Sequence, residues 1–333
     1  HLHWFYWESY STWLSGFSLF TVSYLWSAGT YLIDKSVMDW SPNAAIAVAL
    51  AFLVVFWLAY DGICRVFGQR KNGDAIVGAL LAVLVAVAAW LACHWFAGRA
   101  AFLLVGAMIA TSMSANVFFW IIPGQRTVVA DIKAGKPVDP IHGKRGKQRS
   151  VHNTYFTLPV LFAMLSGHYS FTYTHPQNWL VLVGMMFAGA AIRQFFVLRH
   201  GFKLGRNAHP WPYALAGILA IVALLVWLKP VPQTTPVATN SGATNAVSTR
   251  AGGQIAYKTL QAVLEQRCYM CHGAEVQMKN VRLDSPEAVK LHAQAVYQQV
   301  VVTRAMPMNN ATAITEAERG LVKQWYEDGA ALN

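Results

Sequence analysis

Charged residues are scarce in this chain, and acidic residues are scarcer than basic ones. Only 12% of the 333 residues are Asp, Glu, Lys or Arg, whereas 55% are hydrophobic and 13 are tryptophan. A soluble enzyme of this length needs far more charged surface. The shortage therefore excludes an ordinary soluble enzyme and favours a chain embedded in a membrane.

The chain also lacks an initiating methionine and a secretory signal peptide, since it opens His1-Leu2-His3-Trp4. A signal peptide would show a basic start, a short apolar run and then small residues. We therefore expect that an upstream segment has been removed or left out of this sequence, and one earlier membrane span with it.

The net charge of +11 is confined to the first part of the chain. From Gln254 onward basic and acidic residues are equal in number, so the excess of Lys and Arg lies upstream. A basic protein can bind nucleic acid, but these charges occur in short loops between apolar runs. They are better explained as determinants of membrane orientation, and we expect no nucleic-acid partner.

Seven apolar runs are long enough to be transmembrane helices, because about 20 residues cross the ~30 Å hydrocarbon core of a bilayer. They lie at 9–28, 43–60, 74–96, 100–122, 155–172, 177–198 and 210–228. The loops between them alternate in charge: those at 65–71, 126–149 and 199–206 are basic, whereas the others hold only Lys35 and Arg99. By the positive-inside rule the basic loops are cytoplasmic, so the chain after the seventh run lies on the opposite side.

Two cysteines occur in the stretch RCYMCHG, 267–273. This spacing is what covalent attachment of a c-type haem requires: Cys268 and Cys271 form thioethers, and His272 binds the iron. A zinc site is the alternative, but it would need further Cys or His at matching spacing. Cys64 and Cys93 lie in apolar runs and are interpreted as small apolar residues.

The residues around this motif predict a small, all-helical class I cytochrome c domain, 254–333. Helices are expected at 255–267, 285–303 and 315–328, the last opening with Thr315 and Glu318 at capping-box spacing. The stretch 230–253 is rich in Pro, Thr, Ser and Asn and predicts a flexible linker. In RAMPMNN, 304–310, Met306 is the predicted sixth ligand of the haem iron and Met308 is its competitor.

Polar side chains gather where the stretch after the fourth run, interpreted as a basic, glycine-broken loop, leads into the fifth run. Arg149, His152, Asn153 and Tyr155 supply donors suited to an anion at a helix N-terminus. Anchoring of the loop is the alternative, and it is favoured for Lys133, Lys136, Lys144 and Lys147. Arg193 lies deep in the sixth run, where a charge is costly in lipid, so it is a further site candidate.

Six segments together resemble the bacterial membrane-bound, cytochrome-c-linked urate oxidases, also called urate hydroxylases. They are HLHWFYWESYSTWLSGF, PGQR, GKRGKQRSVHNTYFTLPVLF, SGHYSF, AAIRQFFVLRHG and the CYMCH tail. The resemblance implies an all-α, multi-spanning transmembrane domain, 1–229, fused to the cytochrome c domain, with eight spans in the full chain. Thr154 and Gln194 depart from the family, which often has Asn and His there, so no direct role is expected for either.

The resemblance also implies an activity and a location. The enzyme would oxidise urate to 5-hydroxyisourate and pass electrons through haem c to a respiratory-chain cytochrome c or terminal oxidase, without forming hydrogen peroxide. It would lie in the bacterial inner membrane, with the cytochrome c domain in the periplasm.

Urate is a planar anion at neutral pH, so its site needs positive charge, amide partners and aromatic walls. His152 is the predicted proton acceptor, because imidazole titrates near neutral pH, and Glu8 is the second candidate. The expected substrate-binding groups are Arg149, Asn153, Asn116, Gln125, Arg126, Tyr155 and Arg193, and the expected walls are Tyr155, Phe118, Phe119, Trp4 and Trp7.

The expected urate site lies near the basic side of the membrane, whereas haem c would lie across most of ~30 Å of hydrocarbon. A non-covalent b-type haem held by His94 and His168 could bridge that distance. The alternative is that both are hydrogen-bonded histidines at the membrane interface.

Two other function classes fit the same pattern. A membrane dehydrogenase for quinol or another small reductant would share the spans and the haem. A transporter or anchor carrying a passive cytochrome would never oxidise urate with any acceptor.

Overall fold

The computed structural model describes residues 3–35, 37–228, 257–278 and 281–332. The chain divides into two compact units, His1–Leu228 and Lys229–Asn333. In their described parts both units are helical, and an isolated bridge between His272 and Gln277 is the only β-type pairing there. The predicted all-α class is thus confirmed, while the predicted linker, 230–253, lies outside the described residues.

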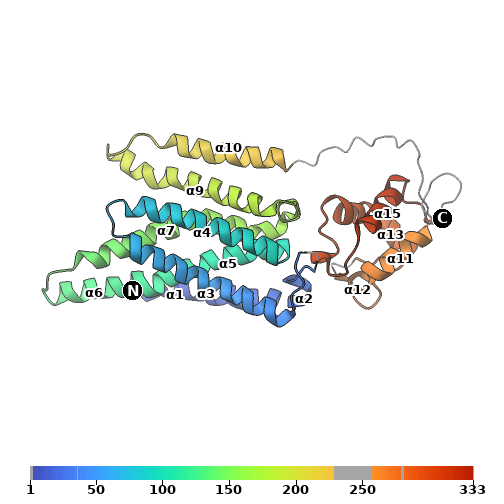
Figure 1. The fold of residues 1–333 in the computed structure, drawn as a ribbon, viewed down its shortest axis with the longest axis horizontal. Helices are drawn as coiled ribbons and strands as arrows, with labels where there is room; N and C mark the ends of the chain where they lie inside the picture. Colours follow the sequence, from blue (N-terminus) through green and yellow to red (C-terminus); the bar gives the residue numbers. More distant parts are fainter. Residues whose placement is uncertain (1–2, 36, 229–256, 279–280, 333) are drawn as a thin grey trace. The chain divides into compact units, whose positions relative to one another are not determined.

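The first unit is a bundle of long helices joined by short connections (Figure 1). Two π-helical turns, η1 (Thr21–Leu25) and η2 (Val117–Ile121), continue α1 and α5, and a 3₁₀ turn, η3 (Ser166–His168), follows α7. The α-helices are α1 (His3–Phe20), α2 (Ala28–Tyr31), α3 (Pro42–Phe67), α4 (Gly73–Trp95), α5 (Gly98–Asn116), α6 (Ile122–Lys133), α7 (Pro140–Leu165), α8 (Ser170–Tyr173), α9 (Asn178–Lys203) and α10 (Trp211–Trp227).

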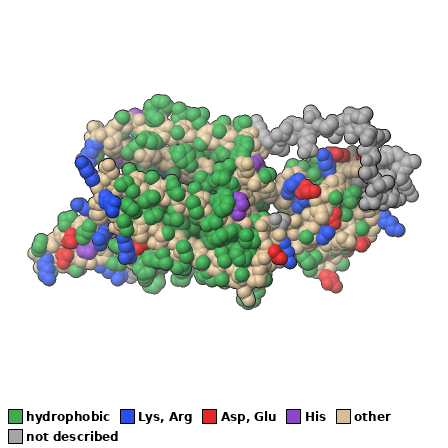
Figure 2. Space-filling model, viewed as in Figure 1, with side chains coloured by type: hydrophobic (Ala, Val, Ile, Leu, Met, Phe, Trp, Pro, Cys, Tyr) green, Lys and Arg blue, Asp and Glu red, His purple; other side chains and the backbone are tan. Residues whose placement is uncertain are grey.

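Four helices in the described part of the chain are long and apolar enough to cross a membrane: Pro42–Phe67, Gly73–Trp95, Gly98–Lys133 and Asn178–Lys203. All seven predicted runs fall largely on helices, but α1, α7 and the 17-residue α10 do not meet this measure of length and composition. Figure 2 shows hydrophobic side chains over the middle of the bundle, with lysines and arginines gathered at one end. The three basic stretches, 65–71, 126–149 and 199–206, lie at that end because successive long helices run in opposite directions (Figure 1).

The prediction of a long loop between the runs 100–122 and 155–172 is wrong. Helix continues through η2 and α6 to Lys133, and α7 begins at Pro140, so only 134–139 connect them. Gly135, at φ +65°, ends α6 in the left-handed conformation that glycine favours. Asp139 then caps α7, its Oδ1 accepting from the Ile141 N–H at 2.9 Å, with proline at the first helical position. These end signals outweigh the helix-weakening glycines inside 140–149.

Two glycines allow helices to approach closely. A Cβ on Gly106 of α5 would lie 3.0 Å from the Ala163 Cβ of α7, and one on Gly217 of α10 would lie 2.6 Å from the Ile192 Cγ1 of α9. Small residues at helix contacts are how transmembrane bundles gain packing without a hydrophobic driving force. The contact of α7 with α5, and that of α7 with α9, position the polar groups described below.

The second unit packs short helices around its own core. Its elements are α11 (Tyr257–Arg267), α12 (Tyr269–His272), α13 (Pro286–Leu291), α14 (Ala293–Tyr297), η5 (Gln298–Val302), η6 (Met308–Asn310) and α15 (Glu316–Glu327). Leu260 and Leu264 of α11 pack with Val322 and Trp325 of α15, all at most 1% exposed. The three helical regions predicted here are confirmed, with the second divided into α13, α14 and η5.

The predicted capping box of the last helix is confirmed. The Thr315 hydroxyl accepts from the Glu318 N–H at 3.2 Å, and Glu318 Oε2 accepts from the Thr315 N–H at 2.6 Å. Two backbone donors that the helix leaves unpaired are therefore satisfied.

Candidate functional site

A buried ion pair joins α3 to α7 inside the first unit. Arg149 Nη2 lies 2.5 Å from Asp61 Oδ1, and the two side chains are 3% and 6% exposed. Trp120 of η2 donates its indole N–H to the same carboxylate at 2.7 Å, and Arg65 donates to the other oxygen at 2.6 Å. Asp61 therefore neutralises Arg149, which is not left as a free cation for a substrate.

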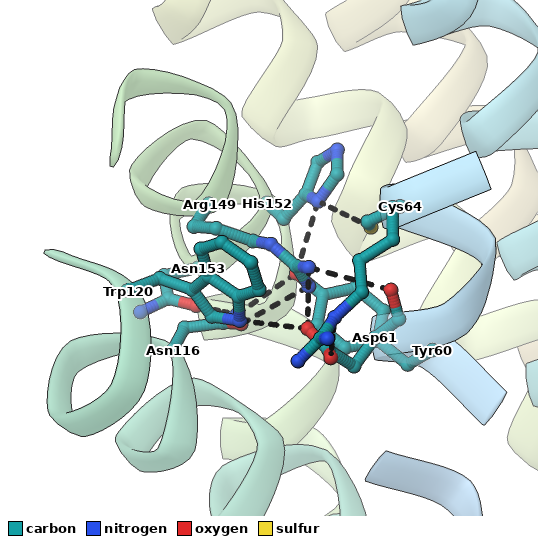
Figure 3. Close-up of polar contacts among 9 residues, drawn as sticks. Tyr60, Asp61, Cys64, Asn116, Trp120, Arg149, His152 and Asn153 are labelled. Carbon is teal, nitrogen blue, oxygen red and sulfur yellow. Dashed lines mark hydrogen bonds and ion pairs between the residues drawn. The ribbon is translucent and has the colours of Figure 1, made fainter. Parts of the chain in front are cut away.

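A chain of neutral hydrogen bonds lies beside this pair (Figure 3). Tyr60 Oη lies 3.0 Å from His152 Nδ1, and Asn116 donates its amide to Tyr60 Oη at 2.8 Å and to Asn153 Oδ1 at 2.9 Å. Asn153 in turn donates to the backbone carbonyl of Met113 at 3.0 Å. Three of the predicted substrate-binding residues, Arg149, Asn116 and Asn153, are thus brought together, but they bind one another and neighbouring residues.

His152 connects this network to a cavity. The cavity has a volume of about 840 Å³ and lies among α4, α5, α7 and α9, with the connection between α3 and α4 at its edge. His152 and Tyr155 line it, whereas Arg149, Asn116 and Asn153 do not. Its size is that of a small-molecule site, and its inner walls are apolar, from Leu81, Val85, Phe156, Val183, Met186 and Phe187.

Cationic side chains line the same cavity. Arg70 follows α3, and Lys144 and Lys147 lie on the first turns of α7. Asp74, the one acid in the lining, accepts from the Gln148 amide at 2.9 Å. The lining residues therefore carry a net positive charge that would attract an anion. The sequence favoured an anchoring role for the two lysines, but the structure also places them at this cavity.

Tyr155 is the second predicted site residue that lines the cavity, together with His152. Its hydroxyl donates to Gln194 Oε1 of α9. Arg193, next in sequence to Gln194, does not line the cavity, and its Nε is buried without a hydrogen-bond partner in the described structure. Gln194, for which no direct role was expected, thus orients a cavity side chain.

Other predicted site residues lie away from the cavity. Glu8, Gln125 and Arg126 are exposed, and none lines it. Trp7, Phe118 and Phe119 are each more than half exposed and are absent from its walls. The Trp4 side chain lies outside the described part of the structure.

The two histidines considered for a b-type haem are both exposed. His94 Nδ1 lies 2.7 Å from the Trp90 carbonyl of its own helix, with the ring 4.3 Å from the Trp90 ring centroid. His168 lies in the turn η3. The two residues lie on different elements, α4 and η3, and a b-type haem held by them stays a prediction.

Tyr60 and Asp61 are the central residues that the sequence reasoning missed. Both lie in the last part of the apolar helix α3. An acidic residue within an apolar run is costly in lipid and marks a site unless it is paired. Asp61 carried that signal, but its partner 88 residues away could not be identified from spacing.

The CxxCH motif of the second unit orients its histidine as a metal-binding histidine is oriented. Cys268 and Cys271 are not joined in a disulfide, and His272 Nδ1 lies 3.1 Å from the Val281 carbonyl. A hydrogen bond from Nδ1–H to a carbonyl fixes the ring and leaves Nε2 to bind a metal. The donor set therefore fits a covalently attached haem.

The segment after η5 presents the two methionines differently. Met306 packs against the core of the unit, whereas Met308 begins the turn η6. The Met306 backbone is held on both sides: its N–H donates to the Gln299 carbonyl at 3.0 Å, and its carbonyl accepts from the buried Arg319 guanidinium at 3.0 Å. The backbone around Met306 is thus fixed on both sides, and its role as the sixth ligand stays a prediction.

Comparison with known proteins gives one match. Residues 1–229 match the family model described as urate oxidase N-terminal. No curated protein and no solved structure matches the chain.

Proposed function

The chain belongs to the urate oxidase N-terminal family over residues 1–229, and from this premise we propose that it is a membrane-bound, cytochrome-c-linked urate oxidase. The family match is the observation that carries the proposal. The cavity beside His152 supports it, because a planar anion fits a small-molecule site that has cationic groups and an apolar interior. Four helices able to cross a membrane support the membrane location.

The reaction needs an acceptor for two electrons. Addition of water at C5 of urate gives 5-hydroxyisourate and releases two electrons and two protons. A haem held by Cys268, Cys271, His272 and Met306 would accept the electrons one at a time and pass them to a respiratory-chain cytochrome c or terminal oxidase. Within this chain Arg70, Lys144 and Lys147 would attract the anion, while His152 and Tyr155 would contact it.

The decisive experiment is the anaerobic addition of urate to the oxidised, full-length protein while the haem α-band is recorded. Urate is expected to reduce the haem, and 5-hydroxyisourate should form at half the molar amount of haem reduced, because each urate delivers two electrons. Reduction by a quinol but not by urate would indicate a different membrane dehydrogenase. No reduction by urate in protein with its full haem content would contradict the proposal.

The sixth ligand provides a prediction within the second unit. Replacing Met306 with leucine is expected to abolish the weak sulfur-to-iron band at the red edge of the oxidised spectrum and to lower the reduction potential, because a thioether favours reduced iron. Spectroscopic redox titration measures both changes. The matched Met308→Leu variant should keep the band; if it loses the band while Met306→Leu retains it, Met308 is the ligand.

A further inference from the structure

The direction of the hydrogen-bond chain beside the cavity is fixed at its far end. A backbone carbonyl only accepts, so the Met113 carbonyl requires Asn153 to present its amide nitrogen there and its Oδ1 to Asn116. Asn116 must then turn its own amide nitrogen toward Asn153. Its Oδ1 is independently held by Arg149 Nη1, a donor only, at 3.4 Å. Two anchors therefore agree on the orientation of Asn116.

This orientation decides what the Tyr60 hydroxyl can do. Its oxygen accepts from the Asn116 amide at 2.8 Å, so its single proton must find a different acceptor. His152 Nδ1, at 3.0 Å, is the acceptor within reach, and the Cys64 sulfur, 3.8 Å from the same nitrogen, is the other polar atom beside it. A thiol sulfur is a weak acceptor, whereas an unprotonated imidazole nitrogen is a strong one. The Tyr60 proton therefore points to His152 Nδ1.

We propose that His152 is held as the tautomer protonated at Nε2 and donates that N–H to an anionic ligand in the cavity. Nδ1 is engaged by Tyr60, while Figure 3 shows the second ring nitrogen turned away from the network. If both ring nitrogens of His152 were protonated, Nδ1–H would point at the Tyr60 hydroxyl oxygen. The Tyr60 proton would then have only the Cys64 sulfur, a weak acceptor, to bind. The arrangement favours a hydrogen-bond donor over the proton acceptor predicted from the sequence.

The ligand that fits such a donor is a flat anion with an oxygen or a ring nitrogen carrying a lone pair. The cationic groups at the cavity would attract the anion over a long range, and the His152 N–H would orient it through a directional hydrogen bond. Only the identity of the ligand rests on the proposed function, since the tautomer follows from the hydrogen bonds alone. Tyr60 is a positioning residue, because it acts on the ligand through His152.

Nitrogen NMR of the full-length protein labelled with ¹⁵N-histidine tests the tautomer directly. The His152 signals are assigned as those missing from the His152→Gln variant, among the eleven histidines of the chain. Nε2 is expected to bear the proton and Nδ1 to be unprotonated. Tyr60→Phe removes the donor and should shift the Nδ1 signal or mix the tautomers. A proton on Nδ1 in the unmodified protein would overturn the proposal.

Binding of urate under anaerobic conditions tests the role. Glutamine can still present an N–H, whereas leucine cannot, so His152→Leu is expected to weaken binding roughly ten-fold or more relative to His152→Gln. Equal binding by both variants would overturn the donor role. If the unmodified protein binds no urate, the proposed function fails, but the NMR result still decides the tautomer.

Discussion

Replacing Asp61 with alanine is expected to destabilise the helical bundle by about 3–5 kcal/mol, because it leaves the Arg149 guanidinium buried without its partner. The pair is 2.5 Å apart, and both side chains are almost fully buried. The same substitution removes the acceptor of the Trp120 indole. Thermal unfolding of the purified protein in detergent, followed by helical circular dichroism, measures the loss.

Two further variants show that the effect arises from the buried charge. Arg65→Ala removes the other cation bound to Asp61, but the Arg65 side chain is 62% exposed, so a loss of at most about 1 kcal/mol is expected. Replacing both partners, as Asp61→Leu with Arg149→Met, should recover much of the stability lost in Asp61→Ala. An Asp61→Ala protein as stable as Arg65→Ala would contradict the assignment.

The double substitution Cys268→Ser with Cys271→Ser is expected to abolish covalent haem completely, because both thioether positions are lost. Peroxidase staining of the protein after denaturing electrophoresis detects attached haem. The variant should still bind urate in its first unit but should no longer transfer electrons from urate to an external cytochrome c.

The chain contains its own control for this result. Cys64 and Cys93 are the remaining free cysteines, both buried in the first unit. The paired substitution Cys64→Ala with Cys93→Ala should leave haem staining unchanged. Loss of staining in this pair, or its persistence in the Cys268 and Cys271 variant, would contradict haem attachment at the CxxCH motif.

Features with a local cause could be predicted from the sequence. Apolar runs of membrane length gave the helices, and the spacing of Thr315 and Glu318 gave the capping box. The long loop predicted before the fifth run was wrong because Gly143 and Gly146 were taken to break a helix. Asp139 and Pro140 start α7 ahead of both glycines, and the helix continues through them.

The candidate site was predictable only in part, because long-range pairing decides which polar groups remain available. His152 and Tyr155, both predicted site residues, line the cavity, since both lie on the cavity side of α7. Arg149 has the same local pattern, but a carboxylate 88 residues away neutralises it. Gln125 and Arg126 were predicted to bind substrate together with Asn116. They are instead exposed on α6, beyond the π-helical turn that follows Asn116.

The two cationic partners of Asp61 differ in when they become available during synthesis. Arg65 is four residues further along the same helix, so its contact at 2.6 Å can form as soon as α3 does. Arg149 follows Asp61 by 88 residues, and a ribosome adding ~5–20 residues per second needs roughly 4–18 s to reach it. During that interval α3, which is long and apolar enough to cross a membrane, would hold a lone carboxylate if it had no cation of its own. Arg65 contributes little to the stability of the finished fold. It is nevertheless the only one of the two arginines that can neutralise Asp61 before Arg149 has been synthesised.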